Sequence, residues 1–162
     1  MLRPMSDPLT EAPGGEPAGA VAITRGVRRA LAQRGFATLT EFRLASGRRA
    51  DVLAVDGDGT VLIVEVKSSV ADFRADRKWT EYRDWCDAFY FAVDEAFPAD
   101  LIPDDCGLYV ADAFGAALLR DAPASKLAAA RRKAVVLRAA LAAAGRLHRL
   151  EDPGFAPDQM GG

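Results

Sequence analysis

The stretch VLIVEVK at residues 61–67 decides the fold prediction, because it is apolar on both faces until it ends in two charged residues. Such a strand normally lies in the centre of a sheet and is covered on both sides. Side chains alternate across a strand, so Glu65 and Lys67 project from one face and Val66 from the other. A carboxylate and an ammonium group are costly to bury unpaired, so their partners must be sought nearby.

The segment before this stretch brings a second acid close to Glu65. Residues 49–55 have strand character, and Asp-Gly-Asp-Gly at residues 56–59 predicts a tight hairpin turn into the next strand. With the turn centred on its second and third residues, position 51 pairs near position 64. The turn lacks the downstream bidentate Glu of an EF-hand loop, so we interpret it as a plain turn and not as a calcium site. We expect Asp51, Glu65 and Lys67 to converge at one spot.

The elements around these two strands predict an α/β fold with a mixed central sheet flanked by helices. Their order is αβββαβ, followed by two further strands and a helix. In the last helix, an apolar stripe of Leu127, Val135, Leu137 and Leu141 is expected to face the core. The expected elements are, in chain order, a helix over residues 23–34 that Gly35 ends, strands at 36–44, 49–55 and 60–67, a helix from Ser69 to about Asp87, strands at 88–93, 107–112 and 116–120, and an Ala-rich helix from Ser125 to near Gly145.

The length of 162 residues fits one domain, which buries roughly 70% of the surface that its unfolded chain exposes. We expect a disordered arm over residues 1–20, a folded domain over 21–150 and a flexible tail over 151–162. Cys86 and Cys106 show neither metal-ligand spacing nor a disulfide framework, which favours a reducing compartment. Without a signal peptide or a run of about 20 apolar residues, the sequence predicts a soluble, cytoplasmic protein with no membrane partner.

Two carboxylates and an amine at one spot suit the hydrolysis of phosphodiester bonds. Closely spaced carboxylates favour a hard cation with oxygen ligands, Mg²⁺ or Mn²⁺, so Asp51 and Glu65 are the expected ligands. Lys67 would orient or deprotonate a metal-activated water, or stabilise the pentacovalent phosphate. In the metal-free protein, one of the two carboxyl groups should have a raised pKa, partly offset by Lys67. A lone Glu-x-Lys at a strand end is commonly a solvated ion pair, so the position of Asp51 is what favours a site.

This arrangement resembles a known superfamily of nucleases. Asp51, followed fourteen residues later by Glu65-x-Lys67 on an adjacent strand within αβββαβ, is similar to the PD-(D/E)XK nuclease core. The chain has Ala50 where the usual motif has Pro, which is a common departure. The resemblance implies a metal-dependent phosphodiester hydrolase with a carboxylate-bound Mg²⁺ and an active-site lysine.

The same resemblance suggests three further site residues. Many members place a metal-binding Glu on the first helix, whereas residues 23–34 contain no acid. Glu41 is the only nearby substitute, and whether it belongs to the metal site stays open. In this superfamily the helix after Glu-x-Lys often lends a side chain to catalysis, for which Lys78 is the first candidate and Tyr82 the second. The alternative is that Lys78 and Tyr82 form a plain surface pair on an amphipathic helix.

Seven longer stretches carry a closer resemblance: EVKSS at 65–69, DFRADRKW at 72–79, EY at 81–82, DWCD at 84–87, FYFAV at 89–93, EFRL at 41–44 and GRRAD at 47–51. They look like the MmcB family of alphaproteobacterial DNA-repair proteins, over roughly residues 22–145. The resemblance implies a DNA endonuclease acting in repair, with DNA as its partner and other repair proteins as further candidate partners. The alternatives are a catalytically silent DNA-binding module of the same fold and a protein-interaction subunit without a nucleic-acid role.

The charge distribution is compatible with a nucleic-acid partner. The net charge is −2, yet seven Arg residues between residues 25 and 49 stand against one acid, Glu41, and seven bases between 126 and 149 against none. A net charge close to zero is therefore compatible with a basic surface on one side of the protein. The last helix offers its bases no acid to pair with, so we expect Arg131, Arg132 and Lys133, together with Arg49, to contact DNA phosphates. A solvated face is the alternative.

Overall fold

The computed structural model describes residues 18–155, so most of the expected N-terminal arm and of the expected tail lies outside the described part. Residues 18–20, which were expected in the arm, form the start of the first helix. The elements are α1 (Ala18–Gln33), β1 (Ala37–Arg43), β2 (Arg49–Val55), β3 (Val61–Val66), α2 (Val70–Ala75), the 3₁₀ helix η1 (Trp79–Trp85), β4 (Ala88–Val93), the short 3₁₀ turn η2 (Ala99–Leu101), β5 (Gly107–Ala111), β6 (Ala116–Arg120) and α3 (Ala129–Glu151).

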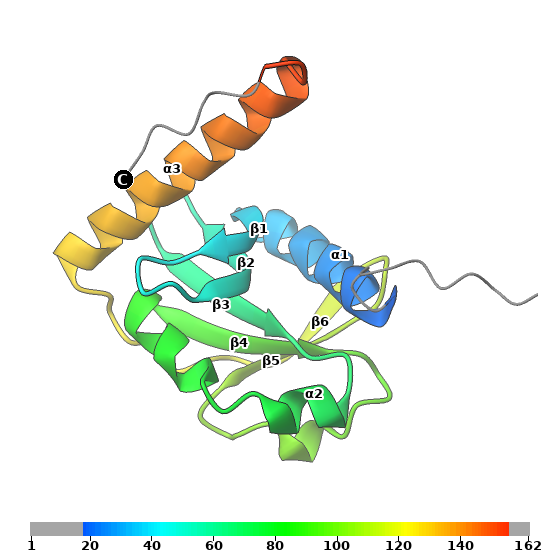
Figure 1. Ribbon diagram of the computed structural model, residues 1–162. Helices are drawn as coiled ribbons and strands as arrows, with labels where there is room; N and C mark the ends of the chain where they lie inside the picture. Colours follow the sequence, from blue (N-terminus) through cyan, green and yellow to red (C-terminus); the bar gives the residue numbers. More distant parts are fainter. Residues whose placement is uncertain (1–17, 156–162) are drawn as a thin grey trace, which may run out of the picture.

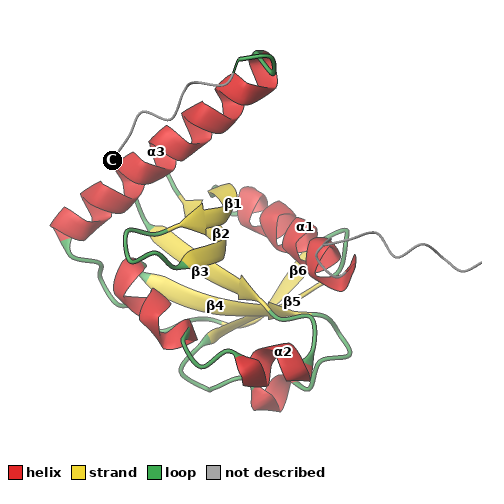
Figure 2. Ribbon diagram, viewed as in Figure 1, coloured by secondary structure: helices red, strands yellow, loops and turns green. Residues whose placement is uncertain are grey.

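The six strands form one mixed sheet, in the order in which they occur in the chain (Figures 1 and 2). β1, β2 and β3 are antiparallel, β4 and β5 run parallel to β3, and β6 is antiparallel to β5. The expected α/β fold with a mixed central sheet and flanking helices is therefore confirmed. The bounds of β2, β4 and β6 are those predicted, and the other strands are shorter by one residue at one or both ends.

The sheet has a hydrophobic core on each face. On one face, Ile23, Val27 and Leu31 of α1 pack against the central strands. On the other face, Tyr82 of η1 and Val135 of α3 join a cluster of aromatic and aliphatic side chains from the strands. Figure 1 shows α1 and α2 on opposite sides of the sheet. All six residues of β3 are buried, as expected of a central strand covered on both sides.

The long helix expected from Ser69 to about Asp87 is wrong, because the chain breaks it at Asp76. Ser69 caps α2 as predicted, since its side chain accepts a hydrogen bond from the Asp72 amide at 3.1 Å. Asp76 then adopts an extended conformation, and its carboxylate accepts a hydrogen bond from the Lys78 amide at 3.0 Å. A short acidic side chain that bonds to the backbone two residues later competes with helix continuation.

The last helix is shifted relative to its prediction. It begins at Ala129, because the Ser125 and Leu127 amides donate hydrogen bonds to Asp87 at 2.7 and 2.9 Å and remain outside the helix. It passes through Gly145, which costs about 1 kcal/mol relative to Ala, and ends at residue 151.

The apolar stripe expected on this helix is only half buried. Leu127 and Val135 are buried as predicted, whereas Leu137 and Leu141 are 57% and 67% exposed. Only one side of α3 contacts the sheet, and Figure 1 shows the helix extending past the edge of the sheet. No helix within residues 18–155 is long and apolar enough to cross a membrane.

Candidate active site

The hairpin between β2 and β3 places Asp51 directly opposite Glu65. Val52 pairs with Val64 in the ladder, so the next position along pairs 51 with 65, one residue from the predicted partner. The Asp51 amide donates a hydrogen bond to Glu65 Oε2 at 3.5 Å, and the Val66 amide donates one to Asp51 Oδ2 at 2.7 Å. Each acid thus contacts the backbone of the other's strand, and the expected convergence of the two carboxylates is found.

Lys67 completes the group, together with an acid that the sequence did not reveal. Its ammonium Nζ lies 2.8 Å from Asp76 Oδ2 and 4.0 Å from Glu65 Oε1. Lys67 and Glu65 are only 4% and 7% exposed, so both are charged groups within the fold. Asp76 was assigned to the middle of a continuous helix, and the low helix propensity of Asp was the only sequence signal of the break. The site therefore contains three acids and one amine.

Burial and charge shift the pKa values of these groups in different directions. Burial, reinforced by the negative charge of Asp51, raises the pKa of Glu65 from 4.5 to about 8, although Lys67 opposes the shift. One carboxyl group with a raised pKa was predicted, and Glu65 is that group. Burial lowers the pKa of Lys67, but the Asp76 hydrogen bond and the Glu65 charge outweigh it, so the net shift is upward. Lys67 is therefore a cation at neutral pH.

The donor set of Asp51 and Glu65 fits a hard dication with further ligands from elsewhere. Within residues 18–155, no three His, Cys, Asp or Glu side chains lie close enough together to hold a metal ion. Mg²⁺, however, is commonly bound by one or two carboxylates plus waters and substrate phosphates. The two facing carboxylates, of which Glu65 has a pKa raised by burial and then by the charge of Asp51, provide that minimal set.

Glu41 lies in the same row of the sheet but does not join the acidic pair. The flanking ladder pairs, Thr40 with Val52 and Phe42 with Ala50, place it opposite Asp51 on β1. Its carboxylate instead forms an ion pair with Arg49, with an Nε–Oε2 distance of 2.6 Å. Its φ of +51° is unusual for a residue other than glycine. Such a conformation costs about 1–3 kcal/mol and is concentrated at functional sites.

Tyr82 contacts the backbone beside the site, at the start of β2, and the Lys78 side chain lies outside the site. The Tyr82 hydroxyl donates a hydrogen bond to the Arg49 carbonyl oxygen at 2.7 Å, and its buried ring stacks on Phe89. Burial and the nearby carboxylates raise the pKa of Tyr82, so it stays protonated and supports the start of β2. Lys78 is exposed, and its contact with the site is through its backbone amide.

Comparison with known proteins shows the family to which the chain belongs. The family model described as "DNA repair protein MmcB-like" matches residues 6–154. The chain belongs to the MmcB-like family. The resemblance read from the sequence is thereby confirmed.

A solved structure is similar to this MmcB-like chain over most of its length. It is described as "SPO1766 protein of unknown function from Silicibacter pomeroyi", with 43% sequence identity and a TM-score of 0.85. The match covers 89% of this chain and 99% of the other. No curated protein matches the chain. The relative supports the fold, and its description assigns no activity.

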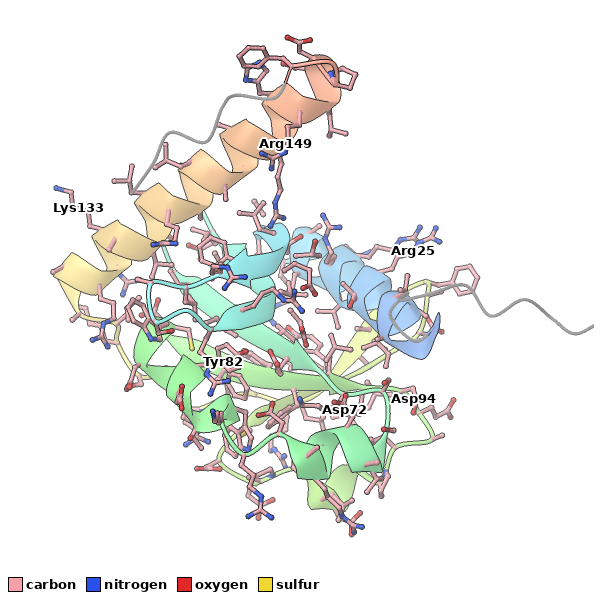
Figure 3. All side chains as sticks on the ribbon, viewed as in Figure 1. Arg25, Asp72, Tyr82, Asp94, Lys133 and Arg149 are labelled. Atoms are coloured by element: carbon pink, nitrogen blue, oxygen red, sulfur yellow. The ribbon has the colours of Figure 1, made fainter. Side chains whose placement is uncertain are left out.

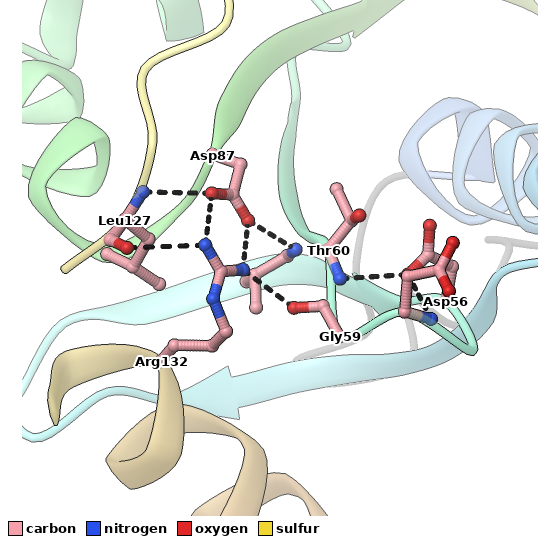
Figure 4. A network of polar contacts seen from close by, with 8 residues as sticks. Asp56, Gly59, Thr60, Asp87, Leu127 and Arg132 are labelled. Atoms are coloured by element: carbon pink, nitrogen blue, oxygen red, sulfur yellow. Dashed lines mark hydrogen bonds and ion pairs between the residues drawn. The ribbon is translucent and has the colours of Figure 1, made fainter. Parts of the chain in front are cut away.

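One of the bases expected to contact DNA has a structural role in the MmcB-like fold instead. The Arg132 guanidinium donates hydrogen bonds to both Asp87 carboxylate oxygens at 2.6 and 2.7 Å and to the Gly59 carbonyl at 2.7 Å (Figure 4). Hydrogen bonds from Arg132, and further ones from the Leu127 and Val61 amides, lower the pKa of Asp87 to about 2. The expectation that the bases of this helix lack acidic partners is therefore wrong for Arg132, because Asp87 comes from a distant part of the chain.

The other three predicted contacts differ in their surroundings. The Arg131 guanidinium lies 4.6 Å from the Trp85 ring centroid and donates a hydrogen bond to the Asp84 carbonyl at 2.8 Å. Arg49 is 60% exposed but is paired with Glu41. Lys133 is exposed, and Figure 3 shows it pointing away from the body near the start of α3.

Proposed function

We propose that this MmcB-like protein is a metal-dependent DNA endonuclease that acts in DNA repair. Asp51 and Glu65 would hold Mg²⁺ or Mn²⁺, and Lys67 is the active-site lysine. The order α1-β1-β2-β3-α2-β4, with Asp51 on β2 and with Glu65 and Lys67 at the end of β3, also supports a PD-(D/E)XK-type core. The family supports the repair role and DNA as the partner.

One observation carries the proposal: the carboxylate of Glu65 is buried opposite Asp51, and Lys67, the amine that approaches it among residues 18–155, is held by another acid. Lys67 Nζ is 2.8 Å from Asp76 but 4.0 Å from Glu65. The fully ionised group therefore has three carboxylates and one ammonium, an excess of two negative charges that a dication balances. A purely structural ion pair would need no such excess.

Each residue of the site would have a separate role in phosphodiester hydrolysis. When bound, the dication lowers the pKa of a water and neutralises charge on the phosphoryl group. Asp51 and Glu65 would hold the dication from two neighbouring strands. Because the pKa of Lys67 is raised, this residue acts as a fixed cation that stabilises developing negative charge, and not as the base. Tyr82 fixes the start of β2 and thereby the position of Asp51.

The test is a cleavage assay on purified protein with Mg²⁺ or Mn²⁺. The substrates are flapped, nicked, mismatched and branched DNA. Asp51→Ala and Lys67→Ala should each reduce cleavage by several orders of magnitude, whereas Lys126→Ala, an exposed base outside the site, should not. Cleavage that survives both site substitutions would place the activity elsewhere.

A second function, a DNA-binding module that does not cut, is favoured by two contacts. Glu41 is paired with Arg49 instead of extending the acidic pair, and Lys67 is held by Asp76. Both contacts would have to loosen to give a larger metal site. Salt-sensitive DNA binding that EDTA leaves unchanged, without cleavage of any substrate in the panel, would support this function over the first.

A further inference from the structure

A basic groove lies between α1 and β1, and Glu41, which occupies one sheet row with Asp51, is part of its lining. It has a volume of about 490 Å³. We call it the α1–β1 groove and define it by the side chains that give it its character, which are Arg25, Arg28, Arg29, Thr38, Thr40 and Glu41. The three guanidinium groups are exposed, and the threonine hydroxyls lie on the sheet side of the groove.

The chemistry of this lining suits phosphate. The planar guanidinium fork matches a phosphate group with parallel hydrogen bonds, and hydroxyls add neutral donors. Arg28 Nε donates a hydrogen bond to the Thr38 hydroxyl at 2.9 Å, which fixes the guanidinium in the lining of the groove. Among the described residues of the lining, Glu41 is the single acid, and its charge is balanced by Arg49. The groove therefore carries a net positive charge.

The position of the groove relates it to the acidic pair. Glu41, Asp51 and Glu65 occupy one row across β1, β2 and β3. Neighbouring strands are about 4.8 Å apart, so the Glu41 backbone lies about 10 Å from that of Glu65. Consecutive phosphates of one DNA strand advance about 3.4 Å along the helix axis. Alternation along β3 puts Glu65 on the sheet face opposite α1, so a DNA strand that reaches both the acidic pair and the groove passes over β1, the edge strand that carries Glu41.

The end of α3 extends the same basic surface. The Arg146 guanidinium donates a hydrogen bond to the Glu41 carbonyl oxygen at 3.2 Å. In Figure 3, Arg149 lies on the part of α3 above β1, and Lys133 lies near the opposite end of that helix. The bases near the start of α3 are either engaged within the fold, as Arg132 is, or distant from this surface.

We infer that the α1–β1 groove binds the phosphates of the DNA strand that enters the site of Asp51 and Glu65. The inference rests on the proposed function in taking DNA as the ligand, but it requires only binding and not cleavage. According to this inference, α1 and not the first half of α3 is the main element that contacts phosphates.

The test is the salt dependence of binding to a fluorescein-labelled DNA duplex, measured by fluorescence anisotropy in EDTA. The double variant Arg25→Ala/Arg28→Ala should bind more weakly, and its slope of log K against log salt should fall in magnitude by about 1.8, or about 0.9 for each lost phosphate contact. The matched control is Arg74→Ala/Lys126→Ala, which removes the same charge from two exposed sites outside the groove and should keep the wild-type slope.

Arg25→Glu is a second groove variant that keeps the Arg28–Thr38 contact, in case the double variant folds poorly. Its binding should be weaker than that of wild type. Equal slopes for wild type and both groove variants would overturn the inference, as would a decrease seen only in Arg131→Ala/Lys133→Ala. The proposed function is judged separately, on cleavage of the flapped, nicked, mismatched and branched DNA with Mg²⁺. A protein that binds through the groove and never cuts would refute the nuclease alone.

Discussion

Replacing Glu65 by Gln should change how the stability of the metal-free protein depends on pH. Because the pKa of Glu65 is raised from 4.5 in the unfolded chain to about 8 in the folded protein, the folded state binds the proton more tightly. The resulting stability is fully present below pH 4.5 and is lost as the pH rises through 8. The difference of 3.5 pKa units, at about 1.36 kcal/mol each, gives an upper bound of about 5 kcal/mol.

The assay is urea denaturation of wild type and Glu65→Gln at pH 5 and pH 9, in EDTA. Wild type should lose up to about 4 kcal/mol of unfolding free energy between these two pH values, because pH 5 already lies above the unfolded pKa of 4.5. The loss should be much smaller in Glu65→Gln because its amide does not titrate. Most of the difference in unfolding free energy between wild type and Glu65→Gln should therefore appear at pH 9. Adding Mg²⁺ at pH 9 should restore stability to wild type only. Identical pH profiles for the two proteins would refute the buried, raised-pKa carboxyl and the geometry behind it.

Two further substitutions test the fold around the site. Asp87→Asn should lower the unfolding free energy by about 1–3 kcal/mol in urea denaturation at pH 7, because the Asn amide nitrogen cannot accept the hydrogen bonds that one Asp87 oxygen accepts and the start of α3 loses part of its anchor. A change below about 0.5 kcal/mol would contradict this role. Gly107→Ala should cost about 1–3 kcal/mol in the same measurement, since the added Cβ would lie 2.2 Å from a Tyr90 ring carbon; a neutral or stabilising effect would show that the ring moves freely.

Much of the acidic site follows from local rules of sequence. Alternation along β3 put Glu65 and Lys67 on one face, and the length of the hairpin turn put Asp51 within one residue of its actual partner. The turn itself forms because the Asp56 carboxylate accepts hydrogen bonds from the Asp58 and Thr60 amides. These features depend on residues that are close together in the chain, which is why a single sequence reveals them.

The features that the sequence did not reveal depend on contacts between distant residues. Asp76 ends α2 and holds Lys67, nine positions earlier in the chain. Asp87 binds Arg132, 45 positions away, and so converts an expected DNA contact into a structural one. Glu41 has a left-handed backbone conformation that no residue pattern indicates. Tertiary contacts thus decide the roles of the Lys67 and Arg132 side chains, whereas the break at Asp76 itself is local, through its hydrogen bond with the Lys78 amide.

The most direct test of the central claim is calorimetric titration of the metal-free protein with Mn²⁺. The claim is that carboxylates of two neighbouring strands share one dication. Substituting a residue that only hydrogen-bonds to a metal ligand typically weakens metal binding 10–100-fold. Asp51→Asn and Glu65→Gln change the proposed ligands themselves, so each should weaken Mn²⁺ binding at least about tenfold. Lys126→Ala should bind Mn²⁺ as wild type does. Equal Mn²⁺ affinity in wild type and both acid variants would contradict the claim.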